Sequence, residues 1–433
     1  MKHNWDWEPG KRIIQDTNKC SADYEWMQEF YTSSDGEKIA AIVHLGEAEF
    51  TLCVNGQTWE NTFDNIWSPK FSPDGRLTAL VSSMGEWTVA VDDQPWEEQY
   101  GFLWDLQFST QGEVIAAAAQ QNMNYGMVRD GQIWENLYSK GSDFCLSSEG
   151  NKTAAVVQKM PLDEGDIETF QKGVFSVAVE GEPWEQNFIN AWKPVFDPKG
   201  DRIAAQVRTT LYDYSIAVDG KTWADNYSCV WEPVFDPVCG KVIAPVRLSG
   251  KWGLAGDAEL LWQPRYNQLW HQQISPDGQI IAAIVAPDYG NFTVAVNDKP
   301  WSKTYSLVND LTLSPDGYRA AAVGSENVSH NRYGGDMGET INRWQIIADG
   351  VPWQGWYDMV YPPVFSQDGK HLAAKVENKG KFTVILDDKA YPQEFPVLWD
   401  PIFSPESDKL LIRALDEQGR FLRIIAKVQE FKA

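Results

Sequence analysis

Short hydrophobic runs alternate with polar turns along the whole chain. Runs such as Phe175–Val179 and Phe292–Val296 are about five residues long and rich in valine and aromatic residues, which is typical of β-strands. Pairs such as Asn55-Gly56 and Asp219-Gly220 separate these runs, and such pairs form tight hairpin turns. The pattern predicts an all-β protein built from antiparallel hairpins.

A turn motif of the form F-S-P-D-G recurs throughout the sequence. Its spacing is about 39 residues, with two longer intervals. Self-similarity at this period predicts a β-propeller made of four-stranded blades. The last residue of the motif falls at Gly36, Gly75, Gly112, Gly150, Gly200, Gly240, Gly278, Gly317 and Gly369, with Asp408 in a degenerate tenth copy.

Proline and alanine positions predict how each blade is oriented. A strand tolerates proline best at a sheet edge, so we expect the proline-bearing strand to line the central channel. Alanine pairs in the next strand allow neighbouring blades to pack closely, and the large aromatic residues are expected to fill the wider spaces between sheets. The prolines are Pro69, Pro194, Pro233, Pro363 and Pro401, and the alanine pairs begin at Ala40, Ala204, Ala282 and Ala373.

The two ends of the chain predict how the ring closes. The last repeat stops after the run Leu422–Ala426 and lacks an outer strand, while Tyr24 stands in the register of such a strand. We therefore expect the N-terminal segment to complete the last blade, giving one propeller of about ten blades over residues 1–433. Two smaller propellers are the alternative, because the insertions at 158–173 and 324–342 lie four repeats apart.

Charge and composition exclude several classes of partner. The chain has 37 Lys and Arg against 61 Asp and Glu, a net charge of −24. Nucleic acids and anionic membrane surfaces need concentrated positive charge, so neither is expected as a partner. No run approaches the roughly 20 apolar residues of a membrane span, and the N-terminus has no apolar signal region. Five cysteines without C-x-x-C spacing favour a reducing cytoplasm.

Catalytic and cofactor motifs are not found in the sequence. The five histidines form no H-x-x-H or H-E-x-x-H pattern, and no G-x-S-x-G, Walker A or EF-hand motif occurs. Paired acids such as Asp92 and Asp93 recur at equivalent turns and are interpreted as turn residues. We therefore expect a non-enzymatic chain with no cofactor or metal of its own.

The two insertions contain the candidate partner-binding residues. Loops that interrupt a regular scaffold often carry binding, although they can equally be neutral surface excursions. The first insertion is acidic and the second mixes polar, basic and aromatic residues. The candidates are Asp163, Glu164, Asp166 and Glu168 in 158–173, and His330, Asn331, Arg332 and Tyr333 in 324–342.

The repeated P-D-G turn followed by a small-residue strand resembles the TolB-type and WD40-like propeller repeats. Tryptophan also recurs at the blade turns, at Trp59, Trp96, Trp134, Trp184, Trp223, Trp262, Trp301 and Trp353. With this register, the acidic, signal-free chain resembles the tryptophan-rich subunit of the Tmc transmembrane electron-transfer complex of sulfate-reducing bacteria.

The Tmc resemblance implies a non-catalytic cytoplasmic subunit, peripheral on the inner face of the cytoplasmic membrane. Its partners would be an iron–sulfur protein and membrane cytochrome subunits, which would carry the cofactors. Two alternatives from other classes stay open. One is a hydrolase or lyase that uses the channel mouth, and the other is a carbohydrate-binding module that uses exposed tryptophans.

Overall fold

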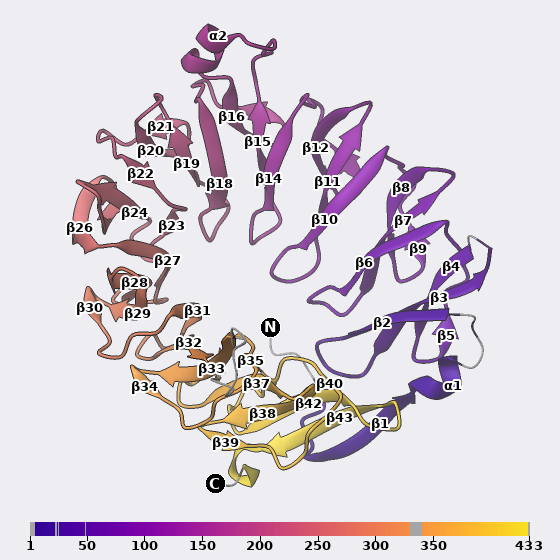
Figure 1. Ribbon diagram of the computed structural model, residues 1–433. Coiled ribbons are helices and arrows are strands. Elements are labelled where there is room, and N and C mark those ends of the chain that lie inside the picture. The colour runs from indigo at the N-terminus through magenta and orange to yellow at the C-terminus, as the bar shows by residue number, and fades with distance from the viewer. Residues whose placement is uncertain (1–4, 22–23, 25, 48, 330–339, 432–433) are drawn as a thin grey trace, which may run out of the picture.

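The fold is described from a computed structural model, which describes residues 5–21, 24, 26–47, 49–329 and 340–431. Ten antiparallel sheets follow one another around a single ring, with the first strand of each sheet nearest the central opening (Figure 1). The predicted all-β, ten-bladed propeller is confirmed, and the alternative of two smaller propellers is wrong. The proline-bearing strand is the innermost strand, as predicted.

The strands of each blade are given from the inner to the outer edge. Blades 1 to 3 contain β2 (Trp26–Thr32), β3 (Ile39–Gly46), β4 (Glu49–Val54) and β5 (Gln57–Thr58); β6 (Asn65–Phe71), β7 (Leu77–Ser83), β8 (Glu86–Val91) and β9 (Gln94–Pro95); and β10 (Phe102–Phe108), β11 (Ile115–Gln121), β12 (Asn124–Arg129) and β13 (Gln132–Ile133). Blades 4 and 5 contain β14 (Gly141–Leu146), β15 (Thr153–Gln158), β16 (Phe175–Val179) and β17 (Glu182–Pro183); and β18 (Asn190–Phe196), β19 (Ile203–Arg208), β20 (Tyr214–Val218) and β21 (Lys221–Thr222).

Blades 6 to 8 contain β22 (Cys229–Val230), β23 (Val234–Phe235), β24 (Val242–Leu248), β25 (Lys251–Gly256) and β26 (Glu259–Tyr266); β27 (Gln268–Ile274), β28 (Ile281–Asp288), β29 (Asn291–Val296) and β30 (Lys299–Pro300); and β31 (Leu307–Leu313), β32 (Ala320–Ser329), β33 (Thr340–Ala348) and β34 (Val351–Pro352). Blades 9 and 10 contain β35 (Met359–Val360), β36 (Val364–Phe365), β37 (Leu372–Asn378), β38 (Lys381–Leu386) and β39 (Lys389–Ala390); and β40 (Val397–Leu398), β41 (Ile402–Phe403), β42 (Lys409–Leu415), β43 (Arg420–Lys427) and β1 (Gly10–Asp16). The short helices are α1 (Thr17–Ser21), α2 (Ile167–Lys172) and η1 (Val428–Glu430).

The inner strands are irregular, which explains why they accept proline. In blade 2 the pairing of β6 with β7 shifts between Trp67 and Lys70, at a β-bulge that contains Pro69. Blades 6, 9 and 10 have their inner strands divided in two around Pro233, Pro363 and Pro401. Since the inner strand is a sheet edge, the missing proline N–H removes no ladder hydrogen bond on its channel side.

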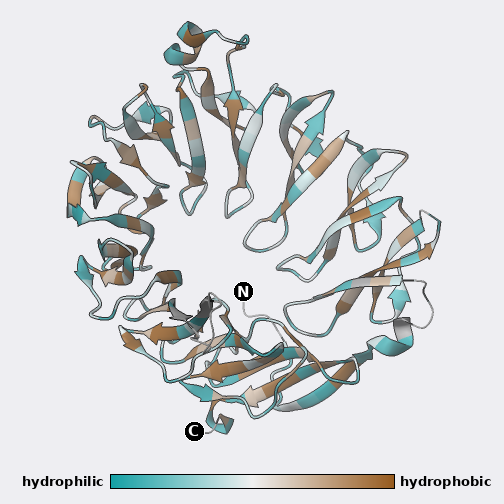
Figure 2. Ribbon diagram, viewed as in Figure 1, coloured by the Kyte–Doolittle hydropathy of each residue, from teal (hydrophilic) through white to brown (hydrophobic). Residues whose placement is uncertain are grey.

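The hydrophobic core lies between successive blades. The predicted alanine pairs of the second strands are buried, and each blade–blade cluster combines these strands with the third strand of the preceding blade. Figure 2 shows hydrophobic residues concentrated in the middle strands and hydrophilic residues in the turns. Small side chains let the sheets approach closely, because a well-packed core leaves few voids.

The P-D-G turns are fixed by hydrogen bonds from serine to aspartate. In blade 7 the Ser275 hydroxyl donates to Asp277 Oδ1 at 2.5 Å, and the backbone N–H of Gln279 donates to the same oxygen at 3.1 Å. These bonds, the Ser275 bond foremost, hold the pKa of Asp277 below its usual range. The turn glycines have φ near +75°, and a Cβ on Gly317 would lie 2.6 Å from the Cβ of Ser275 in the preceding turn. Glycine at this position therefore serves both the turn and the contact between blades.

The N-terminal strand closes the ring. β1 pairs antiparallel with β43, from Gly10 opposite Ile425 to Asp16 opposite Arg420, and so supplies the missing outer strand of blade 10. The predicted closure is confirmed, although the position of Tyr24 was wrong. Helix α1 separates Tyr24 from β1, and the Tyr24 hydroxyl lies near Cys53 Sγ at 3.9 Å in blade 1.

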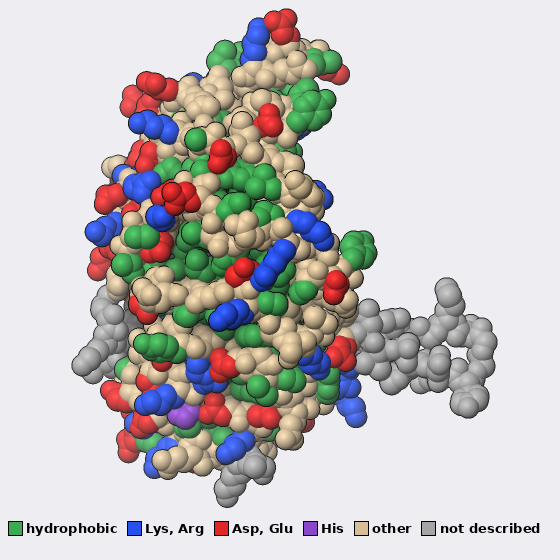
Figure 3. Space-filling view, turned by 90° about the vertical axis from the view of Figure 1, so that its left-hand side faces the viewer, with side chains coloured by type: hydrophobic (Ala, Val, Ile, Leu, Met, Phe, Trp, Pro, Cys, Tyr) green, Lys and Arg blue, Asp and Glu red, His purple; other side chains and the backbone are tan. Residues whose placement is uncertain are grey.

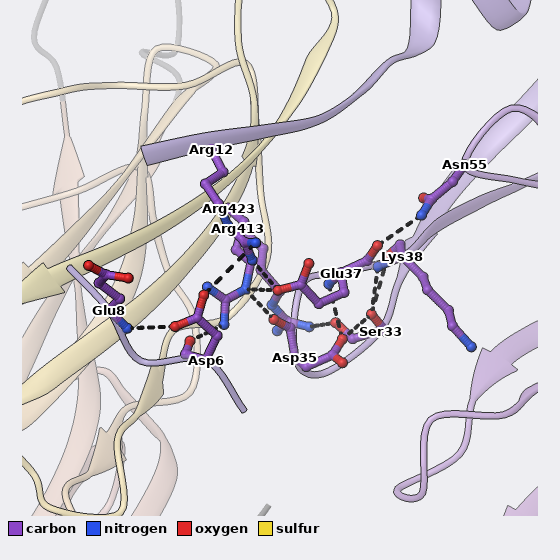
Figure 4. A network of polar contacts seen from close by, with 10 residues as sticks. All are labelled: Asp6, Glu8, Arg12, Ser33, Asp35, Glu37, Lys38, Asn55, Arg413 and Arg423. Carbon is purple, nitrogen blue, oxygen red and sulfur yellow. Dashed lines mark hydrogen bonds and ion pairs between the residues drawn. The ribbon is translucent and has the colours of Figure 1, made fainter. Parts of the chain in front are cut away.

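A network of buried polar contacts joins blade 10 to blade 1 (Figure 4). Arg423 on β43 is only 2% exposed, and its guanidinium contacts Glu37 Oε1 at 2.9 Å and the Asp35 carbonyl at 2.8 Å. It also donates to the carbonyl of Asp6, which precedes β1, at 2.5 Å. Arg413 on β42 donates to the Ser33 carbonyl at 3.0 Å, and burial lowers its pKa to about 10, so it remains a cation at neutral pH. The first turn, the N-terminal segment and the last blade are thus held by the same two arginines.

We predict that Arg423→Ala lowers stability far more than Arg12→Ala. Removing the buried guanidinium leaves the Asp35 and Asp6 carbonyls without this donor and opens a cavity at the seam, at a cost of about 3–5 kcal/mol. Arg12 also contacts Glu37, but its side chain is about half exposed, so its loss costs at most about 1 kcal/mol. Urea unfolding followed by circular dichroism measures both midpoints. Equal midpoints for the two variants would contradict the assigned role of Arg423.

A second prediction concerns acid sensitivity at the β42–β43 turn. Burial alone would raise the pKa of Asp416, but hydrogen bonds from the Arg420 side chain (2.7 Å) and from backbone N–H groups lower it overall. Its contribution to stability is therefore complete above the unfolded pKa near 3.9 and is lost as pH falls through the lower folded pKa. Asp416→Asn should lower the thermal midpoint at pH 7 and flatten its decline below about pH 4. Glu417→Gln, on the same turn but exposed, should keep the wild-type acid decline.

Candidate functional site

The two faces of the ring differ in what they carry. One face contains the P-D-G turns between first and second strands, and we call it the turn face. The opposite face contains the starts of the inner strands and the connections between second and third strands. Both insertions are connections of the latter kind, between β15 and β16 and between β32 and β33. We therefore call this side the insertion face.

The first insertion forms a small helix at the rim of blade 4, where Figure 1 shows α2 projecting beyond the ring. Asp166 caps this helix by accepting a hydrogen bond from the backbone N–H of Thr169 at 3.0 Å. Hydrogen bonds from the Thr169 side chain and from this N–H lower the pKa of Asp166. Glu168 pairs with Lys172 one turn along the helix at 2.7 Å. Two of the four predicted acids thus have local partners within the helix, while Asp163 and Glu164 are exposed.

The second insertion is an extension of the blade itself. β32 and β33 continue their pairing past the regular blade, as far as Ser329 opposite Thr340. The chain therefore leaves the ring as a two-stranded hairpin. The predicted residues His330, Asn331, Arg332 and Tyr333 lie outside the described residues.

Tryptophans of the inner strands lie near the channel on the insertion-face side. In four blades the third residue of the inner strand is tryptophan, and in two more a tryptophan directly follows the first inner segment. The expectation that the large aromatics fill the spaces between sheets is wrong for two of these six tryptophans. Trp67 is 49% exposed and Trp231 is 40% exposed. A strand pattern fixes the side on which a residue lies, but the neighbouring blade decides whether that side is covered. The six residues are Trp67, Trp104, Trp192, Trp231, Trp270 and Trp399.

Each of these tryptophans rests on an aromatic residue of the same blade. Trp231 stacks on Trp252 with ring centroids 5.4 Å apart and an interplanar angle of 4°. Trp192 stacks on Tyr214 at 6.3 Å, and Trp270 packs on Phe292 at 5.4 Å. The supporting residues stand at the start of the third strand, next to the connections of the insertion face. Aromatic pairs of this kind fix ring orientation and leave the opposite ring face available.

A cavity of 610 Å³ opens among the inner strands of blades 5, 6 and 7. Its size is within the range of small-molecule sites. Three of the inner-strand tryptophans form its walls, together with side chains that can donate and accept hydrogen bonds. The lining residues are Trp192, Lys193, Gln206, Tyr214, Cys229, Trp231, Glu232, Gln268 and Trp270.

Charged side chains occupy the bulge of the inner strand in most blades. Lys193 and Asp143 lie on neighbouring blades with Nζ and Oδ1 3.9 Å apart. Burial raises the pKa of Asp310, and nearby His271 acts in the opposite direction. The acidic members of this set are Glu29, Asp105, Asp143, Glu232, Asp310 and Asp400. The channel rim is therefore mainly negative.

Metal binding and membrane crossing find no support in the described part of the chain. Within it, no three His, Cys, Asp or Glu side chains are grouped as metal ligands, and no helix is long and apolar enough to cross a bilayer. Burial raises the pKa of the Cys229 thiol in the cavity wall, so this thiol is not activated as a nucleophile. On the outer rim, which Figure 3 views directly, hydrophobic side chains gather among mixed charges, and β26 exposes Leu260 and Leu261 there.

Comparisons with known proteins give only distant structural likenesses. No known protein family and no curated protein matches the chain. The chain is similar to a solved eukaryotic initiation factor at 10% identity over 92% of both chains, with a TM-score of 0.43. It is similar to the Dos1 propeller at 12% identity over 97% of this chain and 95% of that one (TM-score 0.36), and to TolB from Acinetobacter baumannii at 16% identity over 54% and 62% (TM-score 0.26). With TM-scores below 0.5, these likenesses carry no argument about the fold family or the activity of this chain.

Sequence reasoning missed the cavity because its residues come from three different blades. Nothing in the sequence of one repeat indicates which neighbours Trp192, Trp231 and Trp270 face. The only available signal was Gln206, which stands where most blades have an apolar residue in the second strand.

We predict that removing the two stacked rings of blade 6 lowers stability by very different amounts. Trp252 is 3% exposed, so Trp252→Ala should cost about 3–5 kcal/mol of stability. Trp231→Ala should cost only about 1 kcal/mol, because its outer face is already exposed to solvent and only the stacking contact is lost. Urea unfolding of both variants tests this. A loss for Trp231→Ala as large as that for Trp252→Ala would make Trp231 a core residue.

Proposed function

We propose that this chain is a non-catalytic propeller subunit that docks onto a membrane-associated redox complex through its insertion face. Its direct partner would be an iron–sulfur subunit, with membrane cytochromes in the same assembly. The chain would reside in the cytoplasm and be held at the inner face of the membrane by these subunits. The redox setting rests on the resemblance to the tryptophan-rich Tmc subunit.

The observation that carries the docking role is that both insertions lengthen the same connection of a blade, the one between its second and third strands. The packing of ten similar blades does not require this connection to be longer in two of them. The helix of 158–173 and the hairpin formed by β32 and β33 both leave the repeat on the side where the inner-strand tryptophans are exposed. Exposed aromatic residues beside protruding loops are typical of protein interfaces.

Charge supports a protein partner with a basic surface. The net charge of −24 and the acidic channel rim would steer such a partner and repel nucleic acids or anionic lipids. Electron transfer itself would belong to the partners. The propeller would hold and orient the iron–sulfur subunit as a rigid platform.

Purification from native membranes tests the proposal. The tagged chain is recovered after mild detergent solubilisation, and its eluate is examined by visible spectroscopy and mass spectrometry. We expect haem and iron–sulfur absorption together with cytochrome and iron–sulfur polypeptides in fixed ratio. A colourless chain recovered alone from the soluble fraction would contradict the redox-complex role.

A hairpin variant locates the docking surface. Residues 327–342 are replaced by Asn-Gly, which joins the paired residues Glu326 and Arg343 through a tight turn. We expect normal folding and about a tenfold loss of recovered partner if the hairpin contributes about 1.4 kcal/mol. The control is the double variant Leu260→Ser and Leu261→Ser on the outer rim, which should recover partner normally. Unchanged recovery with the shortened hairpin would exclude the hairpin as the docking element.

A further inference from the structure

The cavity among blades 5, 6 and 7 contains a buried amide that has no partner among the described residues. Gln206 is 8% exposed and lines the cavity, and its side chain makes none of the described hydrogen bonds. The amide nitrogen and oxygen of Gln206 are not among the buried unpartnered atoms, so they are open to the cavity and available for hydrogen bonds. The amide offers an acceptor and two donors to an occupant.

Comparison with the other blades shows that Gln206 is unusual. The same position of the second strand is apolar in seven blades and polar only at Gln206, Lys375 and Arg413. Lys375 pairs with Asp400 at 3.2 Å and lies over the Tyr361 ring, and Arg413 bonds to blade 1 across the closure. Gln206 alone among the three faces a cavity rather than a partner within the chain.

The indole rings of the cavity present open faces. Trp252 covers one face of Trp231 in a nearly parallel stack, and the 40% exposure of Trp231 is consistent with an open opposite face. Trp192 and Trp270 are oriented by their own supports and line the same space. The face of an indole is electron-rich and attracts cations, most strongly where water is excluded.

Glu232 gives the cavity an uncompensated negative charge. Its backbone carbonyl accepts the Nε2 of Gln272 at 2.6 Å, which fixes the segment that carries it, but its carboxylate makes no ion pair within the described chain. Lys193, the one cation of the lining, lies 3.9 Å from Asp143 of blade 4 and is shared with that carboxylate. The acidic channel rim adds to the negative potential around the cavity.

We propose that this cavity is a binding site for an organic cation, an alkylammonium or guanidinium group held between the indoles and Glu232, with the Gln206 amide bonding to its polar remainder. A neutral ligand would leave the Glu232 charge uncompensated, and an anion would meet the acidic rim. The same chemistry is available from a free small cation and from a basic side chain of a protein. The site does not depend on the docking role, since it is a property of the isolated chain.

Isothermal titration of the full chain with matched probes tests the proposal. The probes are choline, its uncharged isostere 3,3-dimethylbutan-1-ol, Nα-acetyl-arginine methylamide and methyl glucoside. We expect millimolar or tighter binding of choline or the arginine derivative, and binding at least tenfold weaker for the isostere. Tighter binding of choline assigns the site to free cations, and tighter binding of the arginine derivative assigns it to a protein side chain.

Variants show whether binding occurs in this cavity. Glu232→Gln and Trp231→Leu should each weaken the cation about tenfold, and Gln206→Leu should weaken it by a smaller factor. Trp67→Leu is the matched control, because Trp67 occupies the same strand position in blade 2, packs on Trp87 at 5.0 Å and is followed by an uncharged serine. Circular dichroism confirms that each variant is folded.

Several results would overturn the proposal. They are equal affinity for choline and its isostere, preferential binding of methyl glucoside, no binding of either cation in the millimolar range, and an equal loss of binding in the Trp67→Leu control.

Discussion

The antiparallel pairing of β1 with β43 is the constraint on which the rest of the structure depends. Each blade buries its hydrophobic faces only against its neighbours, so an open ring would leave one face of the first blade and one of the last in water. The N-terminal strand removes both exposed faces by making the last blade from the two ends of the chain. Positions far apart in the sequence are thereby fixed relative to one another around a single channel.

The closing seam differs chemically from the other blade contacts. Elsewhere, alanine and branched aliphatic residues pack between sheets, whereas Arg413 and Arg423 are buried at the seam and bonded to the first turn. A buried charge adds little stability over a hydrophobic residue, but it strongly disfavours a wrong neighbour that cannot satisfy it. A different neighbour of blade 10 would leave both guanidinium groups buried without the Ser33 and Asp35 carbonyls.

The regular ring separates structural and candidate functional chemistry onto opposite faces. Serine–aspartate bonds and turn glycines such as Gly317 repeat on the turn face and serve packing. The insertion face departs from the repeat through α2, the β32–β33 hairpin and the exposed indoles of Trp67 and Trp231. The segments and residues that depart from the blade repeat are therefore the candidates for function, while those that follow it serve packing.

The sequence predicts the ring well because local chemistry repeats in it. Turn spacing predicted the blades, Pro69 and its equivalents predicted the inner edge, and the missing outer strand predicted the closure. The candidate site was harder to predict from the sequence. The exposure of Trp231 depends on whether side chains of the adjacent blades cover it. Gln206, Glu232 and Trp270 line one cavity but belong to three different blades. Helix α1, which displaces Tyr24 from the closing strand, has no clear signal in five residues.

The central claim is that the insertion face binds the partner subunits, and oxidative footprinting tests it most directly. Hydroxyl radicals would label the isolated chain and the chain in its membrane assembly, and mass spectrometry would quantify labelling of Trp67, Trp231 and the exposed turn-face residue Tyr318. The account predicts strong protection of the two tryptophans in the assembly and unchanged labelling of Tyr318. Protection of Tyr318 with unchanged labelling of both tryptophans would contradict it.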